Sequence, residues 1–252
     1  MTKNIWITGA SSGIGKALAI KFTTEGWHVA ASARRENLLQ ELNNNNLNIH
    51  SFPLDVRDES QTKKVFQNII EKFKTIDIAV FCTGIHDPEA EKKLSSEKIR
   101  EIMETNFFGT VNCIMAVNEC FKERKNGHIS IVSSVASYRG LPTASGYCAS
   151  KAALTSLAES LYFNFKRHGV RISIISPGFI KTPMTDKNKF PMPMIKSAEY
   201  AAEKMFIGLT KKNVFEIHFP IVFTMLMKLI QMMPNWLYFM IAGKGIKKMK
   251  RF

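Results

Sequence analysis

The chain has 252 residues, of which 45% are hydrophobic and 22% are charged. This composition is ordinary for a globular protein and argues against a wholly disordered, collagen-like or many-span membrane chain. The formal net charge of +14 raises the question of a nucleic acid or an anionic membrane as partner. Because no aromatic-interleaved basic platform or known binding module accompanies the charge, we expect no nucleic-acid role.

Short β-branched runs alternate with longer amphipathic stretches along the chain, which predicts repeated βα units on a parallel sheet. The predicted strands are 3–8, 28–33, 48–53, 77–81, 128–133, 170–176 and 214–219. The predicted helices lie near 14–25, 36–42, 59–73, 96–124, 146–167 and 198–209. We therefore expect an α/β fold with one catalytic domain over residues 1–219 and a helical extension over 220–252.

The four cysteines and the N-terminus indicate the compartment. Cys82, Cys113, Cys120 and Cys148 form no C-x-x-C pair, so the sequence suggests neither a disulfide framework nor a metal site. The residues before the first glycines lack the apolar segment of a secretory signal. We expect a protein of the cytoplasm with no bound metal.

A glycine-rich segment follows the first predicted strand and opens the first predicted helix. It reads Thr-Gly-Ala-Ser-Ser-Gly-Ile-Gly over residues 8–15. Glycines here allow a tight turn and let backbone N–H groups approach a pyrophosphate, which the positive end of the helix dipole favours. The spacing differs from the common G-x-G-x-x-G fingerprint, so the segment indicates a different branch of nucleotide binders.

Tyr147 and Lys151 are four residues apart in a predicted helix, so their side chains share one face. The pKa of a free tyrosine is about 10, and a nearby ammonium group stabilises the phenolate and lowers that pKa. Ser134 lies where the fifth predicted strand ends, where its hydroxyl can hydrogen-bond a substrate carbonyl. These three residues are the candidates for proton transfer and substrate orientation.

With these motifs, residues 3–219 resemble the short-chain dehydrogenase/reductase family. The resemblance implies a doubly wound Rossmann fold whose seven-stranded parallel sheet has the order 3-2-1-4-5-6-7 and is flanked by helices. It also implies NAD(P) binding and reversible carbonyl/alcohol chemistry. The catalytic residues that it implies are Asn106, Ser134, Tyr147 and Lys151. The cofactor-binding residues that it implies are Gly9, Ser11, Ser12, Gly13, Ile14, Gly15, Arg34, Arg35, Asp55, Val56, Gly84, Asn106, Tyr147, Lys151, Pro177, Gly178, Ile180 and Thr182.

The family pattern assigns a role to each of these groups. Tyr147 is the implied proton donor, Lys151 holds the nicotinamide ribose, and Ser134 orients the carbonyl. Asn106 is implied to hold a water in the proton relay. Asp55 is implied to meet the adenine. Thr182 is implied to contact the carboxamide.

One motif departs from the family. Members usually carry Asn-Asn-Ala-Gly after the fourth strand, whereas this chain has Phe-Cys-Thr-Gly over residues 81–84. Gly84 is retained, but the asparagine that usually supports the central sheet is replaced. The replacement affects the support of the central sheet more than the catalytic chemistry, because the four catalytic residues are all present. For Cys148, next to Tyr147, we expect a small buried side chain.

The residues at the end of the second predicted strand indicate which nicotinamide cofactor the chain prefers. It has no acidic residue for a ribose 2′-hydroxyl and continues into Arg34 and Arg35. A guanidinium group matches a 2′-phosphate. The sequence therefore favours NADP(H) over NAD.

The last part of the chain is apolar and basic. Residues 184–196 predict an irregular lid whose apolar side chains suggest a lipophilic substrate. Residues 221–237 are apolar except for a stripe of Thr224, Lys228, Gln231 and Asn235. Six basic residues and no acidic ones lie from Pro220 to the end. This pattern favours an interfacial helix on an anionic membrane over a spanning one, with an oligomer interface or substrate cover as alternatives.

These observations predict an NADPH-dependent oxidoreductase of a lipophilic carbonyl/alcohol substrate, and the family resemblance implies a homo-dimer or tetramer. Two alternatives stay open. One is a non-catalytic NADP-binding sensor or interaction protein on the same fold, and the other is an NAD-dependent alcohol dehydrogenase.

Overall fold

The computed structural model describes residues 3–91 and 93–249, and it contains the predicted seven-stranded sheet. All strand pairs are parallel, in the order β3-β2-β1-β4-β5-β6-β7. The strands are β1 (Asn4–Thr8), β2 (His28–Ala33), β3 (Ile49–Pro53), β4 (Ile78–Phe81), β5 (His128–Val132), β6 (Arg171–Pro177) and β7 (Glu216–Phe219). The prediction of a doubly wound Rossmann fold is confirmed.

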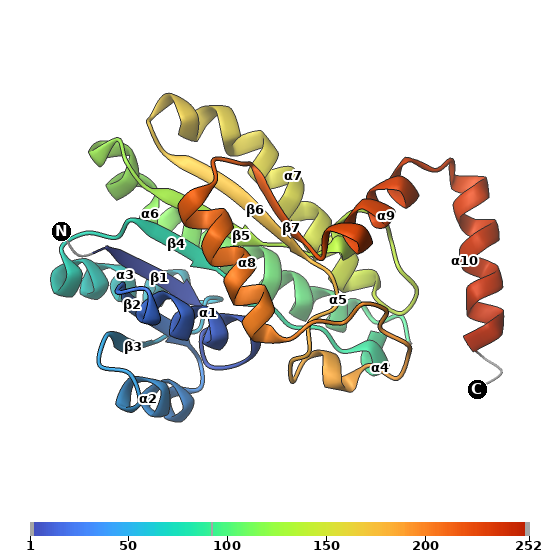
Figure 1. Ribbon diagram of the computed structural model, residues 1–252, viewed down its shortest axis with the longest axis horizontal. Coiled ribbons are helices and arrows are strands. Elements are labelled where there is room, and N and C mark those ends of the chain that lie inside the picture. Colours follow the sequence, from blue (N-terminus) through green and yellow to red (C-terminus); the bar gives the residue numbers. More distant parts are fainter. Residues whose placement is uncertain (1–2, 92, 250–252) are drawn as a thin grey trace.

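Helices cover both faces of the sheet (Figure 1). The α-helices are α1 (Gly13–Thr24), α2 (Glu36–Asn44), α3 (Glu59–Phe73), α4 (Pro88–Glu91), α5 (Ser96–Met103), α6 (Gly109–Arg124), α7 (Ser145–Arg167), α8 (Ala198–Lys211), α9 (Ile221–Met232) and α10 (Asn235–Met249). The described residues also include the π-helical turn η1 (Glu104–Phe108) and the 3₁₀ turns η2 (Val135–Ser137) and η3 (Thr185–Lys187).

Each face of the sheet has its own hydrophobic core, because successive side chains of a strand point to opposite faces. In β1, Ile5 and Ile7 pack with α1, α2 and α8, whereas Trp6 packs with α3, α6 and α7. Both faces of β1 are fully buried, as expected for a central parallel strand. This burial fixes the ends of the strands, where the chain crosses into the loops that form the site.

The predicted helix over residues 96–124 is one helical run with a π-turn inside it. Helix α5 continues through η1 into α6, and Asn106 lies within the π-turn. A π-turn adds a residue to the helical period and occurs often at functional sites. The 3.6-residue pattern of the sequence gives no sign of such a turn.

The predicted apolar helix over residues 221–237 consists of two helices. Helix α9 ends at Met232, and α10 begins at Asn235 after Pro234, which cannot continue a helix. Helix α10 lies at one end of the molecule (Figure 1). Within the described ranges, no helix is long and apolar enough to cross a membrane. Lys250 and Arg251 of the basic C-terminal sequence lie outside the described residues.

Candidate active site

A cavity of about 670 Å³ lies at the carboxyl ends of strands β1 to β6. Ser134 and every predicted cofactor residue except Asn106 line this cavity. Thr105, next to Asn106, is on its wall. In open α/β sheets ligands bind at this edge, where the strand order reverses. The structure therefore brings the glycine loop, the arginines and the Tyr147–Lys151 pair to one site.

The glycine loop has the geometry of an anion cradle. Gly9 and Gly13 adopt φ values of +68° and +55°, which favour glycine. A Cβ atom on Gly15 would lie 2.3 Å from the carbonyl oxygen of Gly9, so only glycine allows α1 to begin this close to β1.

The N-terminus of α1 is open to a ligand. No side chain caps it, although Asp58, Ser95 and Ser197 cap α3, α5 and α8. The first-turn N–H groups of α1 are thus left for a ligand, and the positive helix end favours an anion. The loop and the helix end fit the pyrophosphate of a dinucleotide.

Two arginines, Arg34 and Arg35, line the cavity next to the glycine loop. Arg35 donates hydrogen bonds from Nη2 to the hydroxyl oxygens of Ser11 (3.0 Å) and Ser12 (2.6 Å). Arg34 lines the same cavity, and its side chain is exposed. Their positions fit a phosphate on the ribose next to the glycine loop.

Asp55 is paired with a residue that the sequence analysis did not single out. Arg57 donates hydrogen bonds to both carboxylate oxygens of Asp55, from Nε at 3.0 Å and from Nη2 at 2.6 Å. These bonds hold the pKa of Asp55 below its usual range. Asp55 is therefore a fixed carboxylate at the cavity wall, and the position of Arg57 two residues after Asp55 was the available signal.

Lys151 is buried behind Tyr147. Its Nζ atom donates a 2.8 Å hydrogen bond to the carbonyl oxygen of Val132 and lies 5.7 Å from the centre of the Tyr147 ring. Burial lowers the pKa of Lys151 to about 8. The structure thus confirms that the i and i+4 side chains share a face of α7 and aims both at the end of β5.

The expected lowering of the tyrosine pKa is wrong for the protein without cofactor. Burial raises the pKa of Tyr147 to about 12, and a hydrogen bond with Ser134 opposes this only in part. The cost of removing the phenolate from water outweighs the neighbouring cation. Tyr147 is therefore a protonated phenol at neutral pH, in the state required of a proton donor.

Asn106 holds the loop after β4. Its side chain accepts a 2.7 Å hydrogen bond from the Ile85 N–H and donates one of 3.0 Å to the Ile85 carbonyl. A third bond, of 3.0 Å, reaches the hydroxyl of Ser150 on α7. Gly84 lies against Asn106 and Lys151, since a Cβ there would be 3.5 Å from Asn106 Oδ1 and 3.4 Å from Lys151 Nζ. Asn106 thus ties the β4 loop to the helix that carries Tyr147.

The unusual motif after β4 is supported by other contacts. The N–H of Cys82 donates a 3.2 Å hydrogen bond to the hydroxyl of Thr8 at the end of β1. Burial raises the pKa of the Cys82 thiol to about 11, so the thiol is neutral. Cys148 is also buried, and its Sγ accepts a hydrogen bond from the Leu141 N–H.

His86 and Glu91 are site residues that the sequence analysis missed. The ring centres of His86 and Tyr147 are 4.6 Å apart, and Nδ1 of His86 lies 2.8 Å from Oε1 of Glu91. Glu91 is buried, and its other oxygen accepts a 2.7 Å hydrogen bond from the Gly146 N–H at the start of α7. The two residues come from the segment around α4, far from Tyr147 in sequence, so no local motif reveals them.

The segment after β6 forms the remaining wall. Pro177, Gly178, Ile180 and Thr182 line the cavity, and the Thr182 N–H is held by the Thr185 hydroxyl at 2.9 Å. Gly178 packs against α9, because a Cβ there would lie 2.7 Å from the Phe223 ring. The C-terminal extension therefore supports the back of this wall.

Comparisons with known proteins agree with this geometry. The family model for short chain dehydrogenases matches residues 3–193. The chain is 34% identical to an uncharacterized oxidoreductase of Myxococcus xanthus, with 92% of this chain and 93% of the relative covered. It is 32% identical to the 3-oxoacyl-(acyl-carrier-protein) reductase of Thermotoga maritima, with 72% and 75% covered.

Solved structures show the same fold. ElxO with NADP bound has a TM-score of 0.76 and 26% identity, with 86% of this chain and 98% of that chain covered. A short-chain dehydrogenase from Streptomyces avermitilis has a TM-score of 0.82 and 23% identity, with 97% and 98% covered. By the family model and its relatives, this chain belongs to the short-chain dehydrogenase/reductase family of oxidoreductases.

Proposed function

We propose that the chain is an NADPH-dependent oxidoreductase that interconverts a carbonyl and an alcohol, with Tyr147 as general acid/base. The observation that carries the proposal is that Ser134, Tyr147 and Lys151 line the same cavity as the open N-terminus of α1. When bound, the nicotinamide nucleotide supplies or accepts the hydride. The protein's own residues orient the substrate and move the proton.

In the direction of reduction, each residue has a defined task. The Ser134 hydroxyl donates a hydrogen bond to the carbonyl oxygen and orients it. Tyr147 donates its phenolic proton to that oxygen as negative charge develops there, which suits its protonated state at neutral pH. The Lys151 ammonium stabilises the tyrosinate that is left, and Asn106 fixes the loop that faces them.

The preference for NADP(H) is supported by Arg34 and Arg35 at the nucleotide end of the cavity. ElxO, which shares the fold at 26% identity, is solved with NADP bound. An NAD-dependent alcohol dehydrogenase is the first alternative, and titration with both nucleotides separates the two.

A lipophilic substrate is supported by apolar side chains in and behind the wall that the segment after β6 forms. Met184 lines the cavity. Phe179 contacts the rings of Phe190 and Phe223 at 6.1 and 5.5 Å between centres. The Thermotoga maritima relative is a reductase of 3-oxoacyl groups, which join a ketone to an acyl chain. We therefore propose ketones or aldehydes on an apolar chain as the substrate class.

The test is NADPH consumption with aldehydes and ketones of increasing chain length. We expect Tyr147→Phe to keep NADPH binding and to lose turnover about 100-fold or more. The matched control is Tyr162→Phe on the same helix, which should leave turnover unchanged. If the wild type binds NADPH but turns over no member of the panel, the sensor alternative replaces the reductase.

Location and assembly are further parts of the proposal. We place the protein in the cytoplasm as a homo-dimer or tetramer, supported by exposed apolar side chains on α6 and α7 such as Met115 and Phe163. We also place residues 220–252 at an anionic membrane surface. Sedimentation analysis of the wild type tests the assembly.

A further inference from the structure

Two residues of the polar stripe, Thr224 and Lys228, face the protein beside the buried Phe223 and Met227, whereas most of the large apolar side chains of both helices are exposed. Thr224 is fully buried, and its hydroxyl lies 2.7 Å from Nδ1 of His218 on β7. Lys228 is paired with Glu216, also on β7. An amphipathic helix of a globular protein normally has the opposite orientation, with its polar face in water.

The C-terminal part of the stripe, Gln231 and Asn235, contacts the loop between Ser134 and Tyr147. Arg139 donates hydrogen bonds to the Gln231 carbonyl (3.3 Å) and to Oδ1 of Asn235 (2.7 Å). Its guanidinium lies 4.5 Å from the centre of the Tyr238 ring. The polar contacts therefore fix the orientation of both α9 and the first turn of α10.

The outward side of these helices, which we call the outer face, carries large apolar residues that recur along α9 at helical spacing and so adjoin one another. Each of them is 48 to 81% exposed. The outer face consists of Ile221, Val222, Met225, Leu226, Leu229, Met232, Trp236, Phe239, Met240 and Ile241. An exposed apolar patch that is continuous in this way marks an interaction surface.

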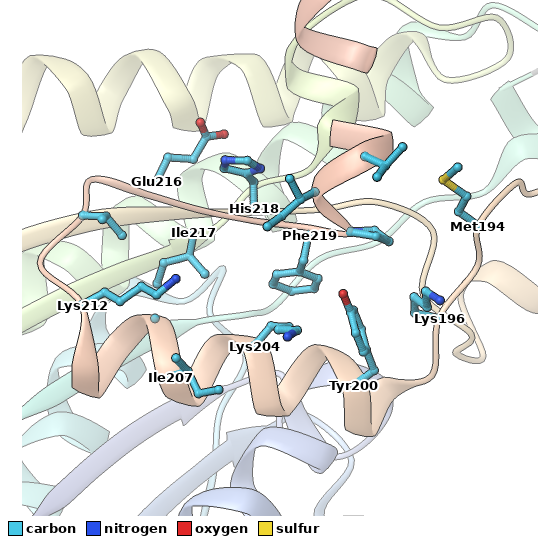
Figure 2. Close-up of a pocket in the computed structure, with 15 residues that line it drawn as sticks. Met194, Lys196, Tyr200, Lys204, Ile207, Lys212, Glu216, Ile217, His218 and Phe219 are labelled. Atoms are coloured by element: carbon cyan, nitrogen blue, oxygen red, sulfur yellow. The ribbon is translucent and has the colours of Figure 1, made fainter. Parts of the chain in front are cut away.

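Basic groups lie next to the outer face. A second cavity, of about 680 Å³, is lined by residues of α8, β7 and the first turn of α9, including Ile221 and Val222 of the outer face. Figure 2 shows Lys204 and Tyr200 extending from α8 toward β7, with Lys212 and Lys196 near the two ends of that helix. The cavity therefore joins three lysines to the apolar surface.

These lysines lack the acidic partners of ordinary surface lysines. Among the described residues, none of the ion pairs includes Lys196, Lys204 or Lys212. The Nζ atoms of Lys196 and Lys204 lie 5.6 and 5.4 Å from the centre of the same ring, that of Tyr200. Glu216, the acidic residue on the cavity wall, is already paired with Lys228. The Tyr200 ring thus lies between two ammonium groups (Figure 2), and each of them favours an anion on this side of the cavity.

We propose that the outer face docks on an anionic membrane, with its apolar side chains in the interfacial region and the three cavity lysines against lipid phosphates. This deepens the proposed membrane association and is independent of the reductase activity. Trp236 and the aliphatic residues suit the boundary between headgroups and acyl chains. Besides Lys228, which is paired with Glu216, the sequence after Phe219 has five basic residues and no acidic ones, and their charge has the same sign as that of the cavity lysines.

A second copy of the chain fits this surface less well. In a two-fold dimer the same patch faces itself, so the lysines of both copies and the basic ends of both chains would approach one another. Like charges at an interface oppose association, whereas anionic lipid attracts each of them.

The test is co-sedimentation of the full chain with vesicles of phosphatidylcholine and phosphatidylglycerol, and with vesicles of phosphatidylcholine alone. We expect binding to the anionic vesicles and partial release by added salt. Leu229→Ser with Trp236→Ser should weaken binding by about tenfold or more, because two large apolar side chains no longer leave water. The control pair, Leu47→Ser with Leu94→Ser, removes exposed apolar side chains outside both the outer face and the proposed subunit contact, and should bind as the wild type.

Charge is tested with Lys196→Gln, Lys204→Gln and Lys212→Gln combined. Each lysine near an anionic surface contributes about a fivefold gain in affinity, so we expect a loss of at least about tenfold and a weaker response to salt. The control is Lys63→Gln, Lys64→Gln and Lys72→Gln, which changes the net charge equally on the exposed side of α3. Melting temperatures show that the variants are folded.

Three results would overturn the proposal. The wild type remains in the supernatant with anionic vesicles, the lysine variant binds as tightly as its control, or the Leu229 and Trp236 variant changes the molar mass of the assembly. The last result assigns the outer face to a second copy. None of these readouts depends on turnover, so the reductase proposal stands or fails by its own assay.

Discussion

The carboxylate of Glu91 lies at the N-terminus of α7, where it accepts a 2.7 Å hydrogen bond from the Gly146 N–H. The same carboxylate is 3.4 Å from the N–H of Tyr147 and holds the ring of His86 against the tyrosine. A negative charge at this end of a helix is favoured by the helix dipole. Glu91 therefore fixes the start of the helix that positions Tyr147 and Lys151.

We expect Glu91→Ala to lower the free energy of unfolding by about 1 to 2 kcal/mol, as the loss of a helix cap does. Turnover should fall further than NADPH affinity, because the first turn of α7 places Tyr147. Glu91→Gln keeps an acceptor and should recover most of the stability. Urea denaturation and steady-state kinetics measure both effects. Equal turnover in all three proteins would leave Glu91 with a purely structural role.

The parts of the site that have local signatures were predictable. Gly13 and Gly15 mark a strand-to-helix turn by their spacing, and Tyr147 and Lys151 share a helical face by theirs. Such signals depend only on backbone conformation and helical period, which the sequence carries directly.

Features that depend on distant partners were not predictable. Glu91 reaches Gly146 across 55 positions, and the π-turn at Asn106 leaves no trace in hydrophobic periodicity. The stripe from Thr224 to Asn235 was visible, but its orientation is set by Glu216 and Arg139 from other elements. Lys228 within an apolar helix was the available signal, since a charge there requires a partner.

Arg34 and Arg35 should have different effects on nucleotide binding. Arg35 is bonded to the hydroxyls of Ser11 and Ser12, so Arg35→Ala should loosen the glycine loop and weaken NADPH and NADH alike. Arg34 makes no such bond to the loop, and a charge-assisted hydrogen bond to a 2′-phosphate contributes about 1.5 to 3 kcal/mol. Arg34→Ala should therefore weaken NADPH by about ten- to a hundredfold and leave NADH nearly unchanged. Fluorescence titration of each variant with both nucleotides distinguishes these effects, and reversed outcomes would exchange the two roles.

The contact of Lys228 with Glu216 should make the attachment of α9 sensitive to acid. Burial alone would raise the pKa of Glu216, but hydrogen bonds from Lys228 and Tyr138 outweigh it and keep the pKa below 4.5. The contact therefore contributes stability above pH 4.5, and this contribution is lost as the pH falls through the lower value in the folded protein.

A double-mutant cycle of Glu216→Gln and Lys228→Gln should give a coupling energy of about 1 kcal/mol at neutral pH, because the pair is only partly buried. The coupling should vanish in acid. Thermal unfolding of the four proteins at several pH values measures it, and a coupling that persists in acid would contradict the assignment.

Lys151 should destabilise the cofactor-free protein below pH 8. Burial lowers its pKa from 10.5 to about 8. At neutral pH the ammonium group is therefore charged in both states, but it is better hydrated in the unfolded chain than in the folded protein. Each pKa unit corresponds to about 1.4 kcal/mol, which puts the upper limit of this penalty at about 3 kcal/mol. Between pH 8 and 10.5 the unfolded chain binds more protons than the folded one, so stability rises with pH through this range. Above 10.5 the lysine is neutral in both states and the penalty is gone.

Lys151→Met should therefore raise the free energy of unfolding at pH 7 while abolishing turnover. The lost hydrogen bond to Val132 reduces the gain, and the difference from the wild type should shrink as the pH approaches 10.5. Lys166→Met, at an exposed position of the same helix, is the control and should show neither effect. Urea denaturation at a series of pH values gives the comparison. A Lys151→Met protein that is less stable than the wild type at pH 7 would mean that the hydrogen bond to Val132 outweighs the burial of the charge.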